Sequence, residues 1–394
     1  MDLKEEALKL HKTHKGKLAT KSKVSIKTKE GLSLVYTPGV AEVCKEIVAN
    51  KDSIYEYTMK SNSVAVVTDG SAVLGLGNIG AEASLPVMEG KCVLFKELAN
   101  IDAFPICIKS QNDDEIINIV KNIAPVFGGI NLEDIAAPRC FKIEGALLDI
   151  GIPVMHDDQH GTATVVLAAL INASKVVGKK LEELKIVING AGAAGTAIAK
   201  MLLCVGIDRK ICTSVKEIVL CDSKGVIYAG RGDLNEFKQQ MAKITNTSKR
   251  KGTLKDALKG ADVFIGVSAA NLLKADDLKV MNKDAIVFAM ANPIPEIMPD
   301  EAKKVAAIVG TGRSDFPNQI NNSLGFPGIF RGALDAKAVK INNEMKIAAA
   351  NALASCVEPT KDKILPSTLD KNVVIKVAEA VRKIAIETGV YRDR

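Results

Sequence analysis

One segment of the chain constrains its fold more than any other, because it joins an apolar run to a glycine turn. Residues 184–189 are rich in β-branched side chains and predict a strand. The run leads directly into Gly190-Ala191-Gly192-Ala193-Ala194-Gly195 and then into an alanine-rich helical stretch. A strand, a G-x-G-x-x-G turn and a helix in this order predict a dinucleotide-binding fold, in which amides at the helix N-terminus meet a pyrophosphate.

An acidic residue ends the next predicted strand. Asp222 closes residues 217–222 and would hydrogen-bond the 2′-hydroxyl of an NAD ribose. A tight turn without a ligand is the alternative, but the second strand and its terminal acid favour dinucleotide binding. Ser223, Lys224 and Lys238 could neutralise the acid and hold the 2′-phosphate of NADP. We therefore expect NADP or NAD as the cofactor, and we favour NADP.

Short apolar runs alternate with helix-period segments along most of the chain. This alternation predicts parallel sheets with helices on both faces, which is the α/β class. We expect an N-terminal α/β domain at residues 1–160 and a Rossmann-like, doubly wound parallel-sheet domain at 161–330. A C-terminal helical segment at 331–394 would pack back on the core. The expected strands are residues 64–67, 104–108, 152–155, 185–188, 217–220, 263–266, 285–290 and 307–309.

Charge and composition exclude several classes of function. The first thirty residues hold nine Lys against four acidic residues, much of the net charge of +7. This stretch lacks the Arg and interleaved aromatic residues of a nucleic-acid surface, so we interpret it as a solvated helix and linker. The longest apolar run, residues 165–171, is too short to cross a bilayer. We expect a soluble cytoplasmic protein that binds neither nucleic acid nor membrane.

The eight cysteines show no spacing typical of a metal site. Several lie inside apolar runs, as Cys204 does. We expect them to be small buried hydrophobic residues in a reducing compartment.

Three carboxylates stand in loops that follow apolar runs: Glu133, Asp134 and Asp158. Neighbouring residues on a strand point to opposite faces, so Glu133 and Asp134 could converge only where the backbone turns. A set of oxygen ligands favours Mg²⁺ or Mn²⁺ over zinc. Surface acids that cap helices are the alternative, and taken alone these residues fit it better. His156 and His160 lack the spacing of a zinc site, and we interpret them as structural.

Proton-transfer residues are harder to recognise. Tyr36 lies in a predicted extended segment before a Pro-Gly turn and could act as an acid. Lys91 precedes the apolar run 92–95, which we interpret as a strand, and burial beside it could lower the pKa of Lys91 towards that of a general base. Asn292 and Asn322 offer neutral donors to carboxylate or carboxamide groups, and residues 75–80 form a second glycine turn. A plain buried Tyr and a solvated Lys are the simpler interpretations of the first two.

The order and spacing of these motifs resemble the malic enzymes, most closely the short microbial form, over about residues 15–390. The motifs that carry the resemblance are Val35-Tyr36-Thr37-Pro38-Gly39-Val40, Gly75-Leu76-Gly77-Asn78-Ile79-Gly80, Met88-Glu89-Gly90-Lys91, Asn131-Leu132-Glu133-Asp134, His156-Asp157-Asp158-Gln159-His160-Gly161-Thr162 and Phe330-Arg331-Gly332-Ala333-Leu334-Asp335.

The resemblance implies oxidative decarboxylation of L-malate to pyruvate and CO₂. Glu133, Asp134 and Asp158 would hold Mg²⁺ or Mn²⁺. Lys91 would take the C2 hydroxyl proton, and Tyr36 would protonate C3 of the enol. A homodimer or higher homo-oligomer is expected, with neighbouring chains able to complete the site.

One stretch departs from the larger animal-type relatives, which carry an Arg just before the second glycine turn. The matching stretch here is Ser71-Ala72-Val73-Leu74, so the malate carboxylate contact is expected from the turn itself with Asn292 and Asn322. Two alternatives stay open. One is a dehydrogenase of another metal-chelating hydroxy acid, such as tartrate. The other is a dinucleotide-binding regulator without activity, which would leave Tyr36, Lys91 and the carboxylates without a purpose.

Overall fold

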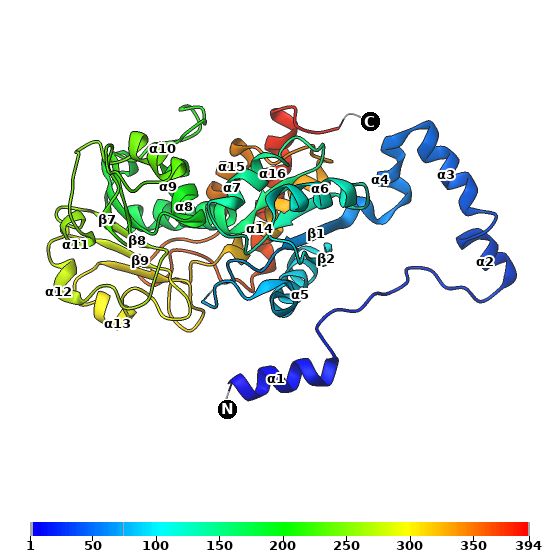
Figure 1. Ribbon diagram of the computed structural model, residues 1–394, viewed down its shortest axis with the longest axis horizontal. Helices are drawn as coiled ribbons and strands as arrows, with labels where there is room; N and C mark the ends of the chain where they lie inside the picture. The colour runs from blue at the N-terminus through cyan, green and yellow to red at the C-terminus, as the bar shows by residue number, and fades with distance from the viewer. Residues whose placement is uncertain (1–2, 74, 393–394) are drawn as a thin grey trace.

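The computed structural model describes residues 3–73 and 75–392, so Leu74 lies outside the described residues. Two parallel sheets lie at opposite sides of a helical layer, and an N-terminal arm extends away from them (Figure 1). The mixed α/β class with a Rossmann-like second sheet, expected from the alternating pattern, is confirmed.

The first sheet has four strands in the order β2-β1-β3-β4, and every pair is parallel. Because parallel strands end at the same edge, the loops after β3 and β4 lie side by side there. The strands are β1 (Ser63–Thr68), β2 (Asp102–Cys107), β3 (Gly129–Leu132) and β4 (Val154–His156).

The second sheet has six strands in the order β10-β9-β8-β5-β6-β7, parallel except for β7. From β5 the chain continues to β6 and β7 on one side of it, and then crosses to β8, β9 and β10 on the other side. The boundary between β5 and β8 is therefore a topological switch point, where dinucleotides bind in such folds. The strands are β5 (Lys185–Asn189), β6 (Glu217–Asp222), β7 (Gly225–Val226), β8 (Val263–Gly266), β9 (Ile286–Ala289) and β10 (Ile308–Thr311).

Helices join one face of each sheet in a shared hydrophobic core, and the other face of each sheet has a smaller core of its own. The longest, α8 (Asp157–Val177), packs against α9 and α15, while α14 packs against α16 and α5. Phe95 of α5 and Phe326 of α14 meet edge to face, 4.7 Å between centroids. The other long helices are α5 (Gly80–Ala99), α6 (Asp113–Ile123), α9 (Ala193–Leu202), α10 (Glu236–Ile244), α14 (Phe326–Asp335), α15 (Asn343–Ala354) and α16 (Lys371–Glu387).

The apolar character of α8 has a structural cause. The helix is long and apolar enough to cross a membrane by length and composition, but 67% of its apolar window is buried inside the protein. It packs against α9 and α15, so apolar residues are needed on most of its faces.

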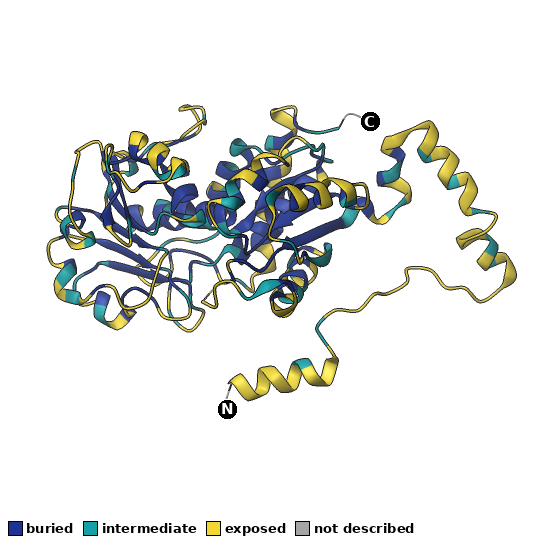
Figure 2. Ribbon diagram, in the orientation of Figure 1, coloured by how far each residue is buried: buried dark blue, intermediate teal, exposed yellow. Residues whose placement is uncertain are grey.

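The N-terminal arm, residues 3–49, is exposed along its length (Figure 2). Its helices α1 (Leu3–His14), α2 (Lys29–Val35) and α3 (Val40–Ala49) contain no buried residue. Lys17 ties the arm to α5, where its backbone N–H donates to Glu89 Oε2 at 3.1 Å.

Several expectations about local structure were wrong. The segment before the Pro-Gly turn is not extended, because Thr28 caps a helix that runs to Val35. Lys91 does not lie beside a strand but inside α5. Cys204 and Cys212 are not free thiols: their Cα atoms lie 5.9 Å apart and they form a disulfide. Strand β7 was not anticipated.

Candidate active site

Lys91 lies in the middle of α5, and its side chain is buried. Lysine side chains are almost never fully buried unless they are paired, and Lys91 has two partners. Its Nζ donates to Glu133 Oε1 at 2.9 Å and also to Asp157 Oδ2. The Phe326 ring centroid lies 4.0 Å from the same atom. Glu133 directly follows β3 and Asp157 directly follows β4, so the edge of the first sheet supplies both carboxylates.

The charge state of Lys91 differs from the expectation. Burial alone would lower its pKa, but the nearby charges of Asp157 and Glu133 outweigh burial and raise the pKa above its ordinary value. The expected drop towards neutrality is therefore wrong for this arrangement of side chains. Lys91 carries its proton here, and it must lose that proton before it can accept another.

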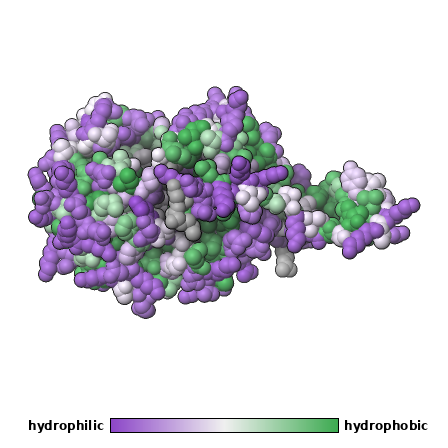
Figure 3. All heavy atoms as spheres, turned by 90° about the horizontal axis from the view of Figure 1, so that it is seen from below, coloured by the Kyte–Doolittle hydropathy of each residue, from purple (hydrophilic) through white to green (hydrophobic). Residues whose placement is uncertain are grey.

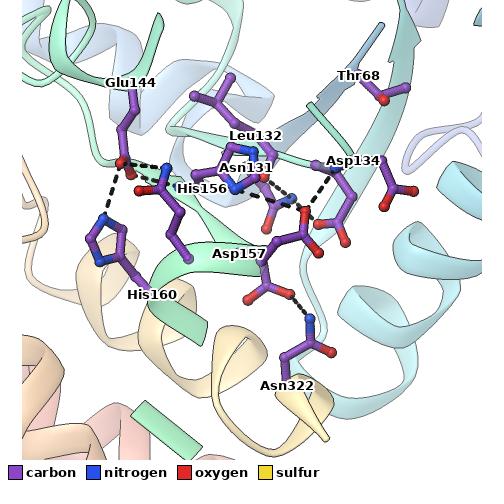
Figure 4. Close-up of polar contacts among 12 residues, drawn as sticks. Thr68, Asn131, Leu132, Asp134, Glu144, His156, Asp157, His160 and Asn322 are labelled. Carbon is purple, nitrogen blue, oxygen red and sulfur yellow. Dashed lines mark hydrogen bonds and ion pairs between the residues drawn. The ribbon is translucent and has the colours of Figure 1, made fainter. Parts of the chain in front are cut away.

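Glu133, Asp134 and Asp158 converge. Each offers a carboxylate oxygen, and these oxygens all lie within 4.8 Å of one another. Asp134 adopts a left-handed backbone conformation (φ +52°), which is the turn that the two adjacent acids need in order to face one site. Its backbone N–H donates to Asp158 Oδ2 at 2.9 Å (Figure 4).

The charges of this cluster fit a divalent cation. Burial and then the charges of Asp158 and Glu133 raise the pKa of Asp134 to about 9. Burial also raises the pKa of Glu133. Carboxylates gathered with too little positive charge around them are stabilised by a hard cation with oxygen ligands. The residues present therefore fit Mg²⁺ or Mn²⁺.

A second layer of polar contacts fixes the first turn of α8, which carries Asp157 and Asp158. Glu144 accepts the backbone N–H of His156 at 2.8 Å and lies 3.0 Å from His160 Nε2 (Figure 4). Burial would raise the pKa of Glu144, but the charge of His160 and its hydrogen bond lower it to about 2. These contacts are consistent with a structural role for His160, and that role stays a prediction for both histidines.

The two expected amide donors lie in different places. Asn322 lies directly at the site, where its Nδ2 donates to Asp157 Oδ2 at 2.5 Å (Figure 4). Asn292 follows β9, and its backbone oxygen lies close to Gly75 in the second glycine turn. That turn is present, since the Gly77 N–H donates to the Val73 oxygen at 2.8 Å.

The first glycine turn lines a cavity of about 690 Å³. Gly190, Ala191 and Gly192 lie on its wall, and Ala193, Ala194 and Gly195 begin α9. A Cβ on Gly195 would lie 1.7 Å from the Gly190 oxygen, so the helix packs closely on the strand only with glycine there. Ala137 and Pro138, which follow the acidic pair closely in sequence, also line this cavity.

Asp222 and Ser223 line the same cavity, but Asp222 is fully engaged. Arg231 Nη1 donates to its Oδ1 at 2.9 Å and Arg231 Nη2 to its Oδ2 at 2.5 Å. Lys238 Nζ adds a bond to Oδ2 at 2.6 Å. Burial opposes these hydrogen bonds, yet the pKa of Asp222 falls to about 2.

Sequence reasoning missed two residues of this arrangement. Asp157 adjoins Asp158, and only the fold distinguishes the residue that holds Lys91 from the one in the acidic cluster. Arg231 lies in a loop after β7, and no motif marks it. Tyr36 is the opposite case, because it is 69% exposed and directly follows α2. Helix α2 lies on the arm, away from the first sheet (Figure 1).

Comparison with known proteins agrees with this geometry. Residues 14–147 match the family model of the malic enzyme N-terminal domain, and residues 159–386 match that of the malic enzyme NAD binding domain. The chain is 57% identical to the bifunctional malic/malolactic enzyme of Bacillus subtilis (strain 168), across 100% of this chain and 95% of that relative.

Two further relatives give the same result. The NAD-dependent malic enzyme of Geobacillus stearothermophilus is 55% identical over 96% of this chain and 78% of its own length. The crystal structure of an NAD-dependent malic enzyme from Thermotoga maritima is 49% identical, with a TM-score of 0.91 over 95% of this chain and 98% of that one. The chain belongs to the malic enzyme family.

Proposed function

We propose that this protein oxidatively decarboxylates L-malate to pyruvate and CO₂, with NAD(P)⁺ as the oxidant and a divalent metal ion. One observation carries the proposal: a buried lysine lies between two carboxylates beside a cluster of oxygen ligands. The cavity lined by the glycine turn shares a wall with the segment that follows Asp134. A complete acid/base and metal set of this kind has no use in a binding regulator.

Glu133, Asp134 and Asp158 would hold the metal ion. When bound, Mg²⁺ or Mn²⁺ supplies Lewis-acid polarisation of the substrate oxygen during hydride loss and decarboxylation. Asn322 fixes the Asp157 carboxylate, and Asp157 in turn fixes Lys91. The chain thus holds its base in one orientation.

Lys91 would accept the C2 hydroxyl proton while hydride leaves C2 for the nicotinamide. Because Lys91 is already charged, its own proton must first move away. Asp157 hydrogen-bonds directly to Nζ and is the carboxylate placed to receive that proton. After CO₂ is lost, the enol needs a proton at C3, and Tyr36 is the proposed donor.

Tyr36 would come from a second copy of the chain. Its own arm holds it away from Lys91, and the arm exposes large apolar side chains, among them Leu8 (74%), Leu34 (77%) and Val48 (83%). A space-filling view shows apolar surface on the projecting part (Figure 3). Short helices with no buried side chain are only marginally stable alone, so a partner that covers them is expected.

A homodimer meets both needs at once. In a two-fold pair each arm would cross to the other molecule, bury its apolar residues there and deliver Tyr36 to the partner's Lys91. The prediction that neighbouring chains complete the site takes this specific form.

We favour NADP⁺ over NAD⁺. Arg231 and Lys238 occupy the Asp222 oxygens that would otherwise accept the ribose 2′-hydroxyl, and both are cations near Ser223 and Lys224. Arg231→Gln should weaken the binding of 2′,5′-ADP about tenfold or more and that of 5′-ADP less than about threefold. Calorimetric titration measures both, and the control is Lys243→Gln, a cation on α10, the helix that also carries Lys238. Equal losses for both nucleotides would contradict the preference.

Initial-rate kinetics test the reaction itself. Malate, Mn²⁺ and NADP⁺ or NAD⁺ should yield reduced cofactor and pyruvate in equal amounts, and a chelator should abolish both. Lactate is assayed in parallel, because one relative is named a malolactic enzyme. Oxaloacetate as the only product, or a higher kcat/KM with tartrate, would overturn the proposal.

A further inference from the structure

Glu296 is a buried carboxylate for which the reaction described above has no role. Its side chain is fully inaccessible, and it lies in the loop after β9. Among the described residues no Lys, Arg or His forms an ion pair with it. Burial raises its pKa, and only hydrogen bonds oppose that effect. A buried, unpaired carboxylate costs free energy, so its place in the fold needs a reason.

The two carboxylate oxygens hold two loops together. Oε1 accepts the Ser268 backbone N–H at 3.0 Å, and Oε2 accepts the Ala291 backbone N–H at 3.1 Å. Ser268 follows β8, and Ala291 follows β9. These are the carboxyl ends of neighbouring parallel strands, the edge at which such sheets bind ligands.

The strand beneath is built to admit this side chain. A Cβ on Gly266, the last residue of β8, would lie 2.3 Å from the Glu296 carboxyl carbon. The backbone of the same loop adds two bonds, from the Asn271 N–H to the Pro295 oxygen and from the Leu273 N–H to the Glu296 oxygen, both at 3.0 Å.

The loop after β8 lines the cavity at the first glycine turn, and the loop after β9 carries Asn292, the residue expected to contact malate. Ser268 lines the cavity, and its hydroxyl accepts from Asn189 Nδ2 at 2.7 Å, one residue before the first glycine turn. Ala291 precedes Asn292, whose backbone oxygen and amide lie against Gly75 and Gly312. The carboxylate therefore connects the cofactor wall with the residue proposed to contact malate.

We propose that Glu296 is a positioning residue, which aims the Asn292 amide at the substrate by fixing the Ala291 and Ser268 backbones. The inference rests on the proposed function, because it takes malate as the substrate. Glu296 does not touch substrate; it acts through the backbone on either side of the site.

Glu296→Gln tests this role with almost no change in volume. The amide keeps one acceptor oxygen and turns a donor towards the second backbone N–H, which leaves that N–H unpaired. We expect the KM for malate to rise about tenfold, a loss typical of one buried hydrogen bond. Glu296→Asp keeps both acceptors, although shorter by one methylene, and should lie between wild type and Gln.

A double-mutant cycle separates positioning from stability. If Glu296 acts through Asn292, Glu296→Gln should raise the KM less than about twofold further in an Asn292→Ala background. NADPH fluorescence titrated with malate gives the same comparison without turnover, since both ligands are already reduced. Full additivity in the cycle, or an unchanged malate affinity in Glu296→Gln, would overturn the inference.

Glu217 provides a matched control. It is also buried and accepts a backbone N–H, from Ser248 at 2.7 Å, but it opens β6 at the opposite edge of the sheet. Glu217→Gln should lower the melting temperature and leave the malate KM unchanged.

Wild-type activity on malate is measured first, so that a failure of the proposed function is distinguished from a failure of this inference. Circular dichroism verifies that each variant is folded. If Glu296→Gln does not fold, Glu296→Asp replaces it in the double-mutant cycle.

Discussion

At the scale of single residues, Lys91 and Tyr36 divide the two proton transfers that the proposed reaction needs. Lys91 is buried between Glu133 and Asp157. Glu133 also belongs to the carboxylate cluster proposed to hold the metal ion, so Lys91 lies beside that cluster. Tyr36 is exposed on the arm. The transfers occur at different substrate atoms, the C2 oxygen and C3, so separate groups from separate elements can serve them.

The two substitutions Lys91→Ala and Tyr36→Phe should therefore fail at different steps. Lys91→Ala should lower hydride transfer about 10² to 10⁴-fold but still allow the C3 protons of pyruvate to exchange with D₂O. Tyr36→Phe should lose that exchange and keep hydride transfer better than pyruvate formation. Proton NMR of pyruvate and the rate of cofactor reduction measure these effects. The same loss of both partial reactions in both variants would contradict the assigned roles.

Asp222 predicts a specific pH dependence of stability. Its pKa is about 2 in the folded chain, below the ordinary value of an unfolded Asp. A lowered pKa contributes stability above the unfolded pKa and loses it as the pH falls towards 2. Urea unfolding between pH 4.5 and 3 should lose at most about 1 kcal/mol in wild type that Asp222→Asn lacks, after allowance for solvent screening. Parallel curves for the two proteins would show that Asp222 is not held in this way.

At the scale of elements, the edges of the two sheets determine which residues meet. Glu133 and Asp134 follow β3, Asp157 and Asp158 follow β4, and the glycine turn follows β5. Parallel strands bring these loops to common edges, although their residues are far apart in the chain. Helix α5 then inserts Lys91 between the carboxylates.

The packing of α9 on the glycine turn gives a prediction at this scale. Gly195→Ala places a Cβ against the Gly190 oxygen, so the helix N-terminus must move away from the turn. NADPH fluorescence should show affinity lowered about tenfold or more. Gly145→Ala, where a Cβ would meet nothing within 4 Å, is the control and should bind normally. Normal binding by Gly195→Ala would contradict the role of close helix–strand packing.

How much the sequence reveals depends on the range of the signal. The glycine turn, the acidic pair and most strands are local patterns, and they were predicted at their positions. Arg231 and Asp157 act through partners brought near by folding, and no local pattern marks them. The disulfide between Cys204 and Cys212 likewise depends on the turn after α9. The raised pKa of Lys91 follows from two carboxylates on other elements, so composition near Lys91 indicated the wrong direction.

At the scale of the whole molecule, one chain holds all but one of the proposed catalytic groups in its core. The arm that carries Tyr36 has no buried residue in its three helices (Figure 2). It exposes large apolar side chains, among them Leu34 and Val48. The roles of the site residues, the homodimer and the division at residues 160 and 330 stay predictions. They share one consequence: a working site would combine Lys91 of one chain with Tyr36 of another.

Mixing two inactive variants tests this claim most directly. Lys91→Ala and Tyr36→Phe are prepared separately, mixed in equal amounts under conditions that exchange subunits, and assayed for pyruvate formation from malate. If the arms cross, each mixed dimer has one site with both residues intact, and the mixture should recover about a quarter of the wild-type rate. If each chain uses its own Tyr36, every site keeps one lesion. Activity no higher than the average of the two variants, after subunit exchange has been verified, would contradict the account.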